Sequence, residues 1–197
     1  MTKPAYGNGI MADFEIREAC QGKQPMISPF QEKLVEKGKV SYGVDPFGYS
    51  VRLGSVFKVV SSVRGWVLDP KEAEKVNWTT LNLEPGETFD ISPGMLVLAE
   101  TLEEFHMPSN VLGLVTNKST YARFGLHHPS TTLEPGWKGR LTLELFNSNR
   151  HPLRIYPGEG IVQILFFAAS HDAEVDYAKR DGKYQNQAGV TPGKIKG

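Results

Sequence analysis

Short hydrophobic runs separated by turns dominate the middle of the chain. Some runs alternate with polar residues and others are continuously apolar, and they lie at 49–60, 95–100, 111–116, 141–146 and 161–167. Pro-Gly pairs punctuate the chain at 85–86, 93–94, 135–136, 157–158 and 192–193. Proline followed by glycine suits the centre of a type II turn, because proline fixes a negative φ and glycine tolerates a positive one. The pattern predicts a mainly β chain, folded as an antiparallel sandwich or barrel.

Helix is predicted at only a few short places. Residues 13–21 form one candidate and residues 119–124 could form a single turn. One or two further turns are expected at 71–75, because Asp69 suits an N-cap and Pro70 suits the first helical position. These helices are too short to change the fold class.

The chain is expected to form one domain over residues 1–197, with a tail at its end. Its length of 197 residues suits one domain, or one with appendages. The stretch 179–197 is rich in Gly, Lys and Gln and has little to bury. We therefore expect a mobile tail there unless a ligand orders it.

The segment 140–147 alternates strictly between two kinds of side chain. Successive strand residues point to opposite faces, which sets Leu141, Leu143 and Leu145 against Thr142, Glu144 and Phe146. A carboxylate between apolar neighbours has a raised pKa and can act as a general base or acid. Glu144 is therefore a candidate catalytic residue. The pattern alone equally allows an exposed glutamate on an outer strand face.

Two cations and two hydroxyls lie within six residues after the apolar run at 111–115. They are Lys118, Ser119, Thr120 and Arg123. If Ser119 begins a helical turn, backbone N–H groups and hydroxyls converge there and suit phosphate oxygens. The alternative is an ordinary capped turn with solvated cations.

Two further segments carry polar groups near turns. Residues 133–139 hold an acid and an indole, Glu134 and Trp137, around a Pro-Gly pair. This segment also reads as a plain hairpin connection. Residues 182–187 hold a lysine, a tyrosine and two glutamines that suit a polyanion, although a disordered terminus has the same composition.

Composition and charge exclude several classes of protein. Lys+Arg and Asp+Glu number 22 each, so the net charge is zero, which argues against a partner as large as duplex nucleic acid. The longest apolar run, 161–169, is half a membrane span and contains Gln163, and the first twenty residues do not resemble a signal peptide. One cysteine permits no internal disulfide. A cytoplasmic protein without a membrane partner is expected.

Several nucleotide and metal motifs are missing from the sequence. Zinc-dependent base deaminases use a His-x-Glu and a Pro-Cys-x-x-Cys element, which one cysteine cannot supply. There is no Walker loop, and no GxGxxG follows a predicted strand. His127 and His128 are adjacent, so they would point to opposite faces of a strand and make a poor metal pair. No metal held by the protein is expected.

Five segments together resemble the dCTP deaminase family of the trimeric dUTPase-like superfamily. They read NKSTYARFGL, LEPGWKG, LTLELFN, IYPGEGIVQILFF and GKYQNQAGVTPGKI, in the family's order and spacing. The resemblance begins near residue 27 and is densest over 113–167. It implies a homotrimer of distorted antiparallel β-barrels with a few short helices. It also implies zinc-independent deamination of dCTP to dUTP and ammonia, which supplies dUTP for dUMP and thymidylate synthesis.

The resemblance also implies roles for individual residues. Glu144 would take a proton from the water that attacks C4 of cytosine, with Ser119 and Arg123 placed around that water. Mg²⁺ would arrive with the triphosphate of dCTP, and dUTP would leave from the same site. The substrate-binding set would be Lys118, Thr120, Thr131, Glu134, Trp137, Gln163, Tyr177, Lys183 and Gln187.

Departures from the family pattern leave more than one function open. Ser50 stands where the family commonly has Asp, and residues 127–130 replace a mostly apolar stretch that lines the base. A modified cytosine nucleotide is therefore an alternative substrate. Three further functions also fit the sequence: a bifunctional enzyme that yields dUMP, a dUTPase-like pyrophosphatase using Glu134, and a catalytically idle nucleotide-binding trimer. Glu144 and the tail sequence favour the deaminase.

Overall fold

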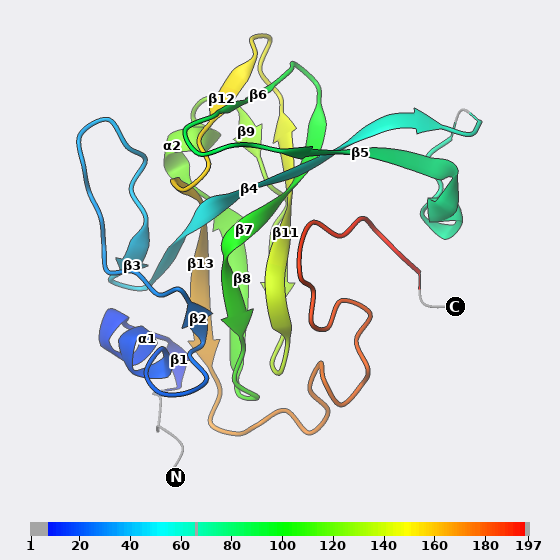
Figure 1. Ribbon diagram of the computed structural model, residues 1–197. Helices are drawn as coiled ribbons and strands as arrows, with labels where there is room; N and C mark the ends of the chain where they lie inside the picture. Colours follow the sequence, from blue (N-terminus) through cyan, green and yellow to red (C-terminus); the bar gives the residue numbers. More distant parts are fainter. Residues whose placement is uncertain (1–7, 66, 196–197) are drawn as a thin grey trace.

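The computed structural model describes residues 8–65 and 67–195 and is built mainly from antiparallel strands (Figure 1). The strands are β1 Gly9–Ile10, β2 Ile27–Ser28, β3 Gly43–Asp45, β4 Gly48–Val63, β5 Val76–Asn82, β6 Phe89–Ile91, β7 Leu96–His106, β8 Val111–Asn117, β9 Leu126–His127, β10 Thr131–Leu133, β11 Lys138–Asn147, β12 Leu153–Ile155 and β13 Gly160–Ala168. The helices are α1 Asp13–Ala19, the 3₁₀ helix η1 Pro70–Lys75 and α2 Ser119–Ala122. The predicted mainly β class is confirmed.

Among the described residues, one curled sheet contains eleven of the strands. Its main path runs β10-β8-β13-β4-β7-β11-β9, and β6 and β12 form a separate pair. Strand β4 is 16 residues long and pairs with β13 at its start and with β7 and β5 further along. Its pairing with β7 has a register shift between Leu53 and Phe57, and in the same stretch pairing with β13 ends at Arg52 and pairing with β5 begins at Val56. That shift bends the sheet into the distorted barrel-like shape of Figure 1.

A glycine permits the bend in β4. A Cβ on Gly54 would lie 2.7 Å from Cγ of Glu100 on β7 and 3.0 Å from the Glu100 carbonyl oxygen. Real side chains do not approach so closely, so only glycine lets the two strands pass here. The strand predicted at 49–60 is therefore one bent element that joins two parts of the sheet.

The three predicted helical segments are present. The first ends at Ala19, two residues earlier than predicted. In η1 the Asp69 side chain accepts a hydrogen bond from the N–H of Lys71, as expected of an N-cap before a proline. Helix α2 contains only four residues.

Four of the five Pro-Gly pairs have the backbone expected of type II turns. Gly86, Gly94, Gly136 and Gly158 have φ of 91°, 71°, 77° and 83°. The prediction for Pro192-Gly193 is wrong, because Gly193 is not among the residues with positive φ. No strand follows that pair among the described residues, so nothing requires the chain to reverse there.

The alternation predicted along β11 is confirmed. Leu141, Leu143 and Leu145 are buried in the core, whereas Glu144 and Phe146 are partly exposed on the opposite face. Thr142 is also buried, because the end of the chain covers it. No helix in the described part of the chain is long and apolar enough to cross a membrane.

Candidate active site

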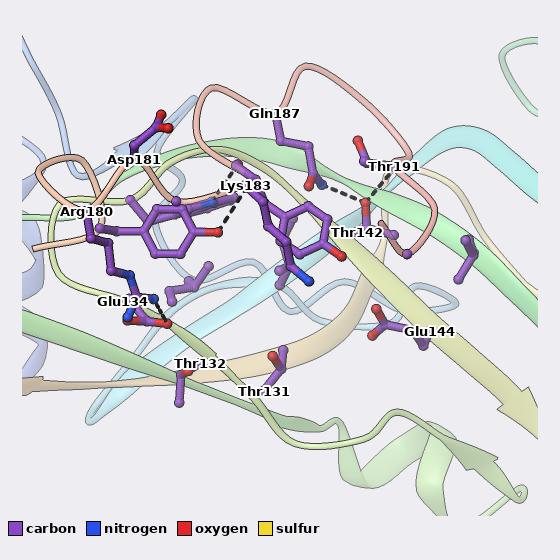
Figure 2. A pocket seen from close by; sticks show the side chains of 18 of the residues that line it. Thr131, Thr132, Glu134, Thr142, Glu144, Arg180, Asp181, Lys183, Gln187 and Thr191 are labelled. Atoms are coloured by element: carbon purple, nitrogen blue, oxygen red, sulfur yellow. Dashed lines mark hydrogen bonds and ion pairs between the residues drawn. The ribbon is translucent and has the colours of Figure 1, made fainter. Parts of the chain in front are cut away.

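A pocket of about 740 Å³ lies between β11, the segment before it and the end of the chain (Figure 2). Seven of the predicted site residues line it, namely Thr131, Glu134, Trp137, Glu144, Tyr177, Lys183 and Gln187. They come from β10, β11, the turn between them and the C-terminal segment. The fold therefore brings together groups that are more than fifty residues apart in the sequence.

Glu144 lies on the pocket side of β11. Its side chain is 40% exposed, and burial of the remainder raises the pKa of its carboxyl above the ordinary value of 4.5. A half-buried carboxylate with a raised pKa can take a proton from water and later return it. The acid–base role of Glu144 stays a prediction.

The C-terminal segment is fastened across β11. The side-chain Nε2 of Gln187 donates to Oγ1 of Thr142 at 2.6 Å and to the Arg140 carbonyl at 2.9 Å. The backbone N–H of Thr191 also donates to Thr142 Oγ1, at 3.0 Å. Figure 2 shows the two contacts to Thr142 above Glu144. Thr142 therefore places the end of the chain over the candidate base.

A second glycine makes this fastening possible. Gly139 has φ of 143°, and a Cβ there would lie 2.6 Å from the Gln187 carbonyl oxygen. Residues 139 and 187 also form an isolated parallel bridge. A larger residue at 139 would push the C-terminal segment away from the sheet. The mobility of 179–197 stays a prediction.

The far side of the pocket is closed by an ion pair and an indole. Glu134 pairs with the guanidinium of Arg180, and Trp137 Nε1 donates to the Tyr184 carbonyl at 2.9 Å. Tyr177 is buried and accepts a hydrogen bond at its hydroxyl from the Tyr184 N–H. The Glu134 carboxylate is therefore engaged by the Arg180 guanidinium and is not free to act as a base in this arrangement.

The remaining predicted site residues lie outside this pocket. They are Lys118, Ser119, Thr120, Arg123 and Gln163, and none of them lines it. Ser119, Thr120 and Arg123 are exposed on α2 and the residue after it. Burial, rather than the charge of Arg123, is the main influence on the pKa of Glu144 within one chain. One chain alone does not assemble the full predicted set.

Comparisons with known proteins place the chain in a family. The family described as dCTP deaminase-like matches residues 10–169, which is most of the chain. The chain belongs to the dCTP deaminase-like family. This agrees with the resemblance found in the sequence.

Relatives within the dCTP deaminase-like family match along nearly their whole length. The chain is 42% identical to a dCTP deaminase of Campylobacter concisus, over 93% of this chain and 96% of that protein. It is 40% identical to one of Nitratiruptor sp., over 95% of this chain and 99% of that protein. A solved dCTP deaminase structure from Agrobacterium tumefaciens has a TM-score of 0.62 at 19% identity, and covers 82% of this chain and 49% of that chain. This last likeness shows the shared fold.

The departure at Ser50 from the dCTP deaminase-like pattern has a structural counterpart. Ser50 Oγ donates to Oδ2 of Asp45 at 2.6 Å and accepts from Lys118 Nζ at 3.0 Å. Gln163 Nε2 donates to the same Asp45 oxygen at 3.2 Å. Asp45 lies on β3, which pairs with β4, so a neighbouring strand supplies a carboxylate to this cluster.

The sequence alone missed several residues of the candidate site. Thr142, Arg180 and Thr191 were not predicted, yet they line the pocket and position its parts. Thr142 shares the alternating face of Glu144, so the same periodicity could have found it. Arg180 and Thr191 carry no local signal, because their roles depend on where the chain end returns.

Proposed function

We propose that this chain is a dCTP deaminase that converts dCTP and water to dUTP and ammonia without zinc. The observation that carries the proposal is the half-buried Glu144 on the wall of a nucleotide-sized pocket. The relatives at 42% and 40% identity bear the name dCTP deaminase, which supports it. Such an enzyme acts on free nucleotides, so we infer a cytoplasmic location.

The proposed reaction needs one base that becomes an acid. Glu144 takes a proton from water as the water oxygen forms a bond to C4 of cytosine. The carboxyl passes this proton to N3. It then takes the proton of the new C4 hydroxyl and passes it to the exocyclic amine, so that C4 becomes a carbonyl carbon. The C4–N bond then breaks with its electron pair leaving on ammonia. A carboxyl group with a raised pKa serves both directions of transfer.

The expected pH dependence of kcat/KM follows from the direction in which the pKa of Glu144 is shifted. The base must be ionised, and burial raises the pKa of Glu144 above 4.5. We expect kcat/KM to fall on acidification, with the midpoint of the acid limb above pH 4.5. A pH–rate profile measures this, and a melting curve at each pH separates the effect from unfolding. A folded enzyme with full activity below pH 4.5 would contradict it.

We infer that the active assembly is a homotrimer in which a neighbouring copy completes each site. Ser119 and Arg123 are exposed and lie outside the pocket of their own chain. Beside them Phe124 is 63% exposed and Tyr156 is 39% exposed, around a mostly apolar hollow. Contact with another copy would cover these rings and carry Ser119 and Arg123 to that copy's Glu144.

Mixed trimers test this arrangement. We expect Glu144→Gln and Arg123→Ala each to be nearly inactive alone. When equal amounts are unfolded and refolded together, about a quarter of the sites should regain both wild-type halves, because each half is drawn at random from two chains. Mixing Glu144→Gln with the double variant should restore nothing. Recovery absent from the first mixture, despite mixed trimers by mass spectrometry, would contradict a shared site.

The pocket suits a magnesium-bound triphosphate. Lys183 brings an ammonium group, and Glu134 and Asp181 bring carboxylate oxygens of the type that Mg²⁺ prefers. We propose that Mg²⁺ enters with the nucleotide and that the C-terminal segment closes over the phosphates. The Lys183 ammonium now donates to the Lys194 carbonyl at 2.8 Å, so it can exchange that partner for a phosphate.

One assay separates the proposed function from its rivals. Purified protein is incubated with dCTP and Mg²⁺ after treatment with a zinc chelator, and dUTP, dUMP and ammonia are quantified. We expect dUTP and ammonia in equal amounts. Formation of dUMP would show a bifunctional enzyme, in which Glu134 is released from its ion pair with Arg180. Turnover of only a 5-substituted dCTP would identify a modified substrate. No turnover of either nucleotide would refute the deaminase, and hydrolysis of dUTP in a parallel incubation would then identify the pyrophosphatase.

A further inference from the structure

One buried histidine lies directly behind the candidate base. His128 follows β9, is 2% exposed, and neither ring nitrogen has a hydrogen-bond partner. A buried polar group without a partner is costly, so a protein retains one mainly where it has a role. Its neighbour His127 is exposed, as expected for adjacent residues on opposite faces. His128 therefore needs an explanation that packing alone does not provide.

The ring of His128 faces Glu144. Its Nε2 lies 3.5 Å from Oε2 of Glu144. The loop that carries it is anchored, because the His128 N–H donates to Oδ1 of Asn117 at 2.7 Å. The histidine is buried and fixed, whereas the carboxylate is 40% exposed and can turn. At 3.5 Å the two atoms lie slightly beyond the usual length of a hydrogen bond, so the contact would need only a small movement of the Glu144 side chain.

The imidazole of His128 is uncharged at neutral pH. Burial lowers the pKa of His128 to about 4, against an opposing effect of the Pro129 backbone. Glu144 is the acidic group that lies within ion-pair distance of the ring among the described residues. A neutral imidazole carries one N–H, which can serve as a donor to a carboxylate without cancelling its charge. His128 does not line the pocket, so it is placed to act on Glu144 rather than on the nucleotide.

We propose that His128 is a positioning residue that donates its Nε2–H to Oε2 of Glu144 and thereby turns the other carboxylate oxygen toward the attacking water. The proposal rests on the function proposed above. The Glu144 side chain is 40% exposed, and the ion-pair contact that the described residues give it is the one with His128. Without that contact its rotamer is poorly restricted. Holding one oxygen leaves one defined oxygen for proton transfer.

Kinetics of two substitutions at 128 test this role. His128→Leu removes the donor but keeps an apolar filling, and we expect kcat for dCTP to fall about 10- to 100-fold, as for loss of a hydrogen bond to a charged group. KM should stay within about two-fold, because His128 does not touch the pocket. The melting temperature should change little, because leucine keeps the buried site filled. His128→Gln, which again offers an Nε2 donor, should recover part of the loss.

An exposed histidine elsewhere in the chain provides the matched control. His171 follows β13, is exposed and does not line the pocket, so His171→Leu should leave kcat within about two-fold of wild type. Wild-type kcat in His128→Leu would overturn the proposal, as would a loss that Gln does not repair while the variant stays folded. If the wild-type enzyme does not deaminate dCTP at all, the proposed function fails instead.

A spectroscopic measurement is independent of turnover. In ¹⁵N-histidine-labelled protein, the His128 ring signals are assigned by their absence in His128→Gln. We expect a neutral Nε2–H tautomer whose Nε2 shift changes in Glu144→Gln and not in Glu134→Gln. A histidine that merely fills the core would show no such response. The Nδ1–H tautomer, or shifts that ignore residue 144, would overturn the proposal even where the kinetics agree.

Discussion

Glu144→Gln is expected to lower kcat for dCTP deamination by about 10²–10⁴-fold, the usual cost of losing a general base. The loss should reach the upper part of that range, because the same carboxyl also protonates the leaving amine. The amide keeps the shape of the side chain but cannot take a proton from water. Binding of dCTP should therefore stay nearly unchanged. Single-turnover kinetics with a parallel binding titration measure both quantities.

A matched control comes from an ordinary strand glutamate. Glu104 on β7 is 48% exposed, lies near Lys138 and does not line the pocket. Glu104→Gln should turn over dCTP within a few-fold of wild type. If Glu144→Gln behaves in the same way, Glu144 is not the base. Glu134 would then be the next carboxylate to replace, and the result would favour the pyrophosphatase hypothesis.

Glu103→Ala is expected to destabilise the fold by about 3–5 kcal/mol, because it leaves one partner of a buried ion pair uncompensated. Glu103 is 0% exposed on β7, and its Oε1 lies 2.7 Å from Arg52 Nε on β4. Its other oxygen accepts the Arg52 backbone N–H at 3.0 Å. The alanine would leave the Arg52 guanidinium, whose side chain is 11% exposed, without its carboxylate, and the Arg52 backbone N–H without its acceptor. Urea unfolding at one fixed protein concentration measures the change.

An exposed ion pair serves as the control for this prediction. Asp90 and Arg154 join β6 to β12 through two hydrogen bonds of 2.7 Å, but both side chains are about half exposed. Asp90→Ala should change the free energy of unfolding far less, because solvent screens the pair. The double variant Arg52→Met/Glu103→Leu should recover much of the loss, since it removes both buried charges. Equal effects of Glu103→Ala and Asp90→Ala would refute the prediction.

Local physical rules were enough to predict the framework of the fold. Alternation along β11 identified its buried leucines and the exposed face of Glu144, because a strand repeats every two residues whatever surrounds it. Four Pro-Gly turns and the Asp69 cap were also predictable, since φ preferences and capping act within a few residues. The turn predicted at Pro192-Gly193 is absent, because a Pro-Gly pair forms a tight turn only where the chain on its two sides reverses direction.

The site residues also divide into those that local patterns identify and those whose roles depend on distant segments of the chain. The types of residue at 118–123, 134, 144 and 183–187 were recognisable from local patterns, but only the family resemblance, and no local pattern, grouped them into one site. Seven predicted residues share one pocket, whereas Ser119 and Arg123 face outward from the same chain. Thr142 and Arg180 gained their roles only when the chain end returned to the sheet. No local pattern specifies which distant segment will arrive.

The sequence by itself determined the strand and turn pattern, the family motifs and Glu144 as the candidate base. The tertiary structure alone decided the rest, because it depends on contacts between segments far apart in the chain. The passage of β4 past β7 at Gly54 and the approach of the C-terminal segment at Gly139 each required a missing side chain at one position. The burial of His128 behind Glu144 depended on β9 pairing with the end of β11. Burial and partner geometry, rather than residue type, set the chemistry of both groups.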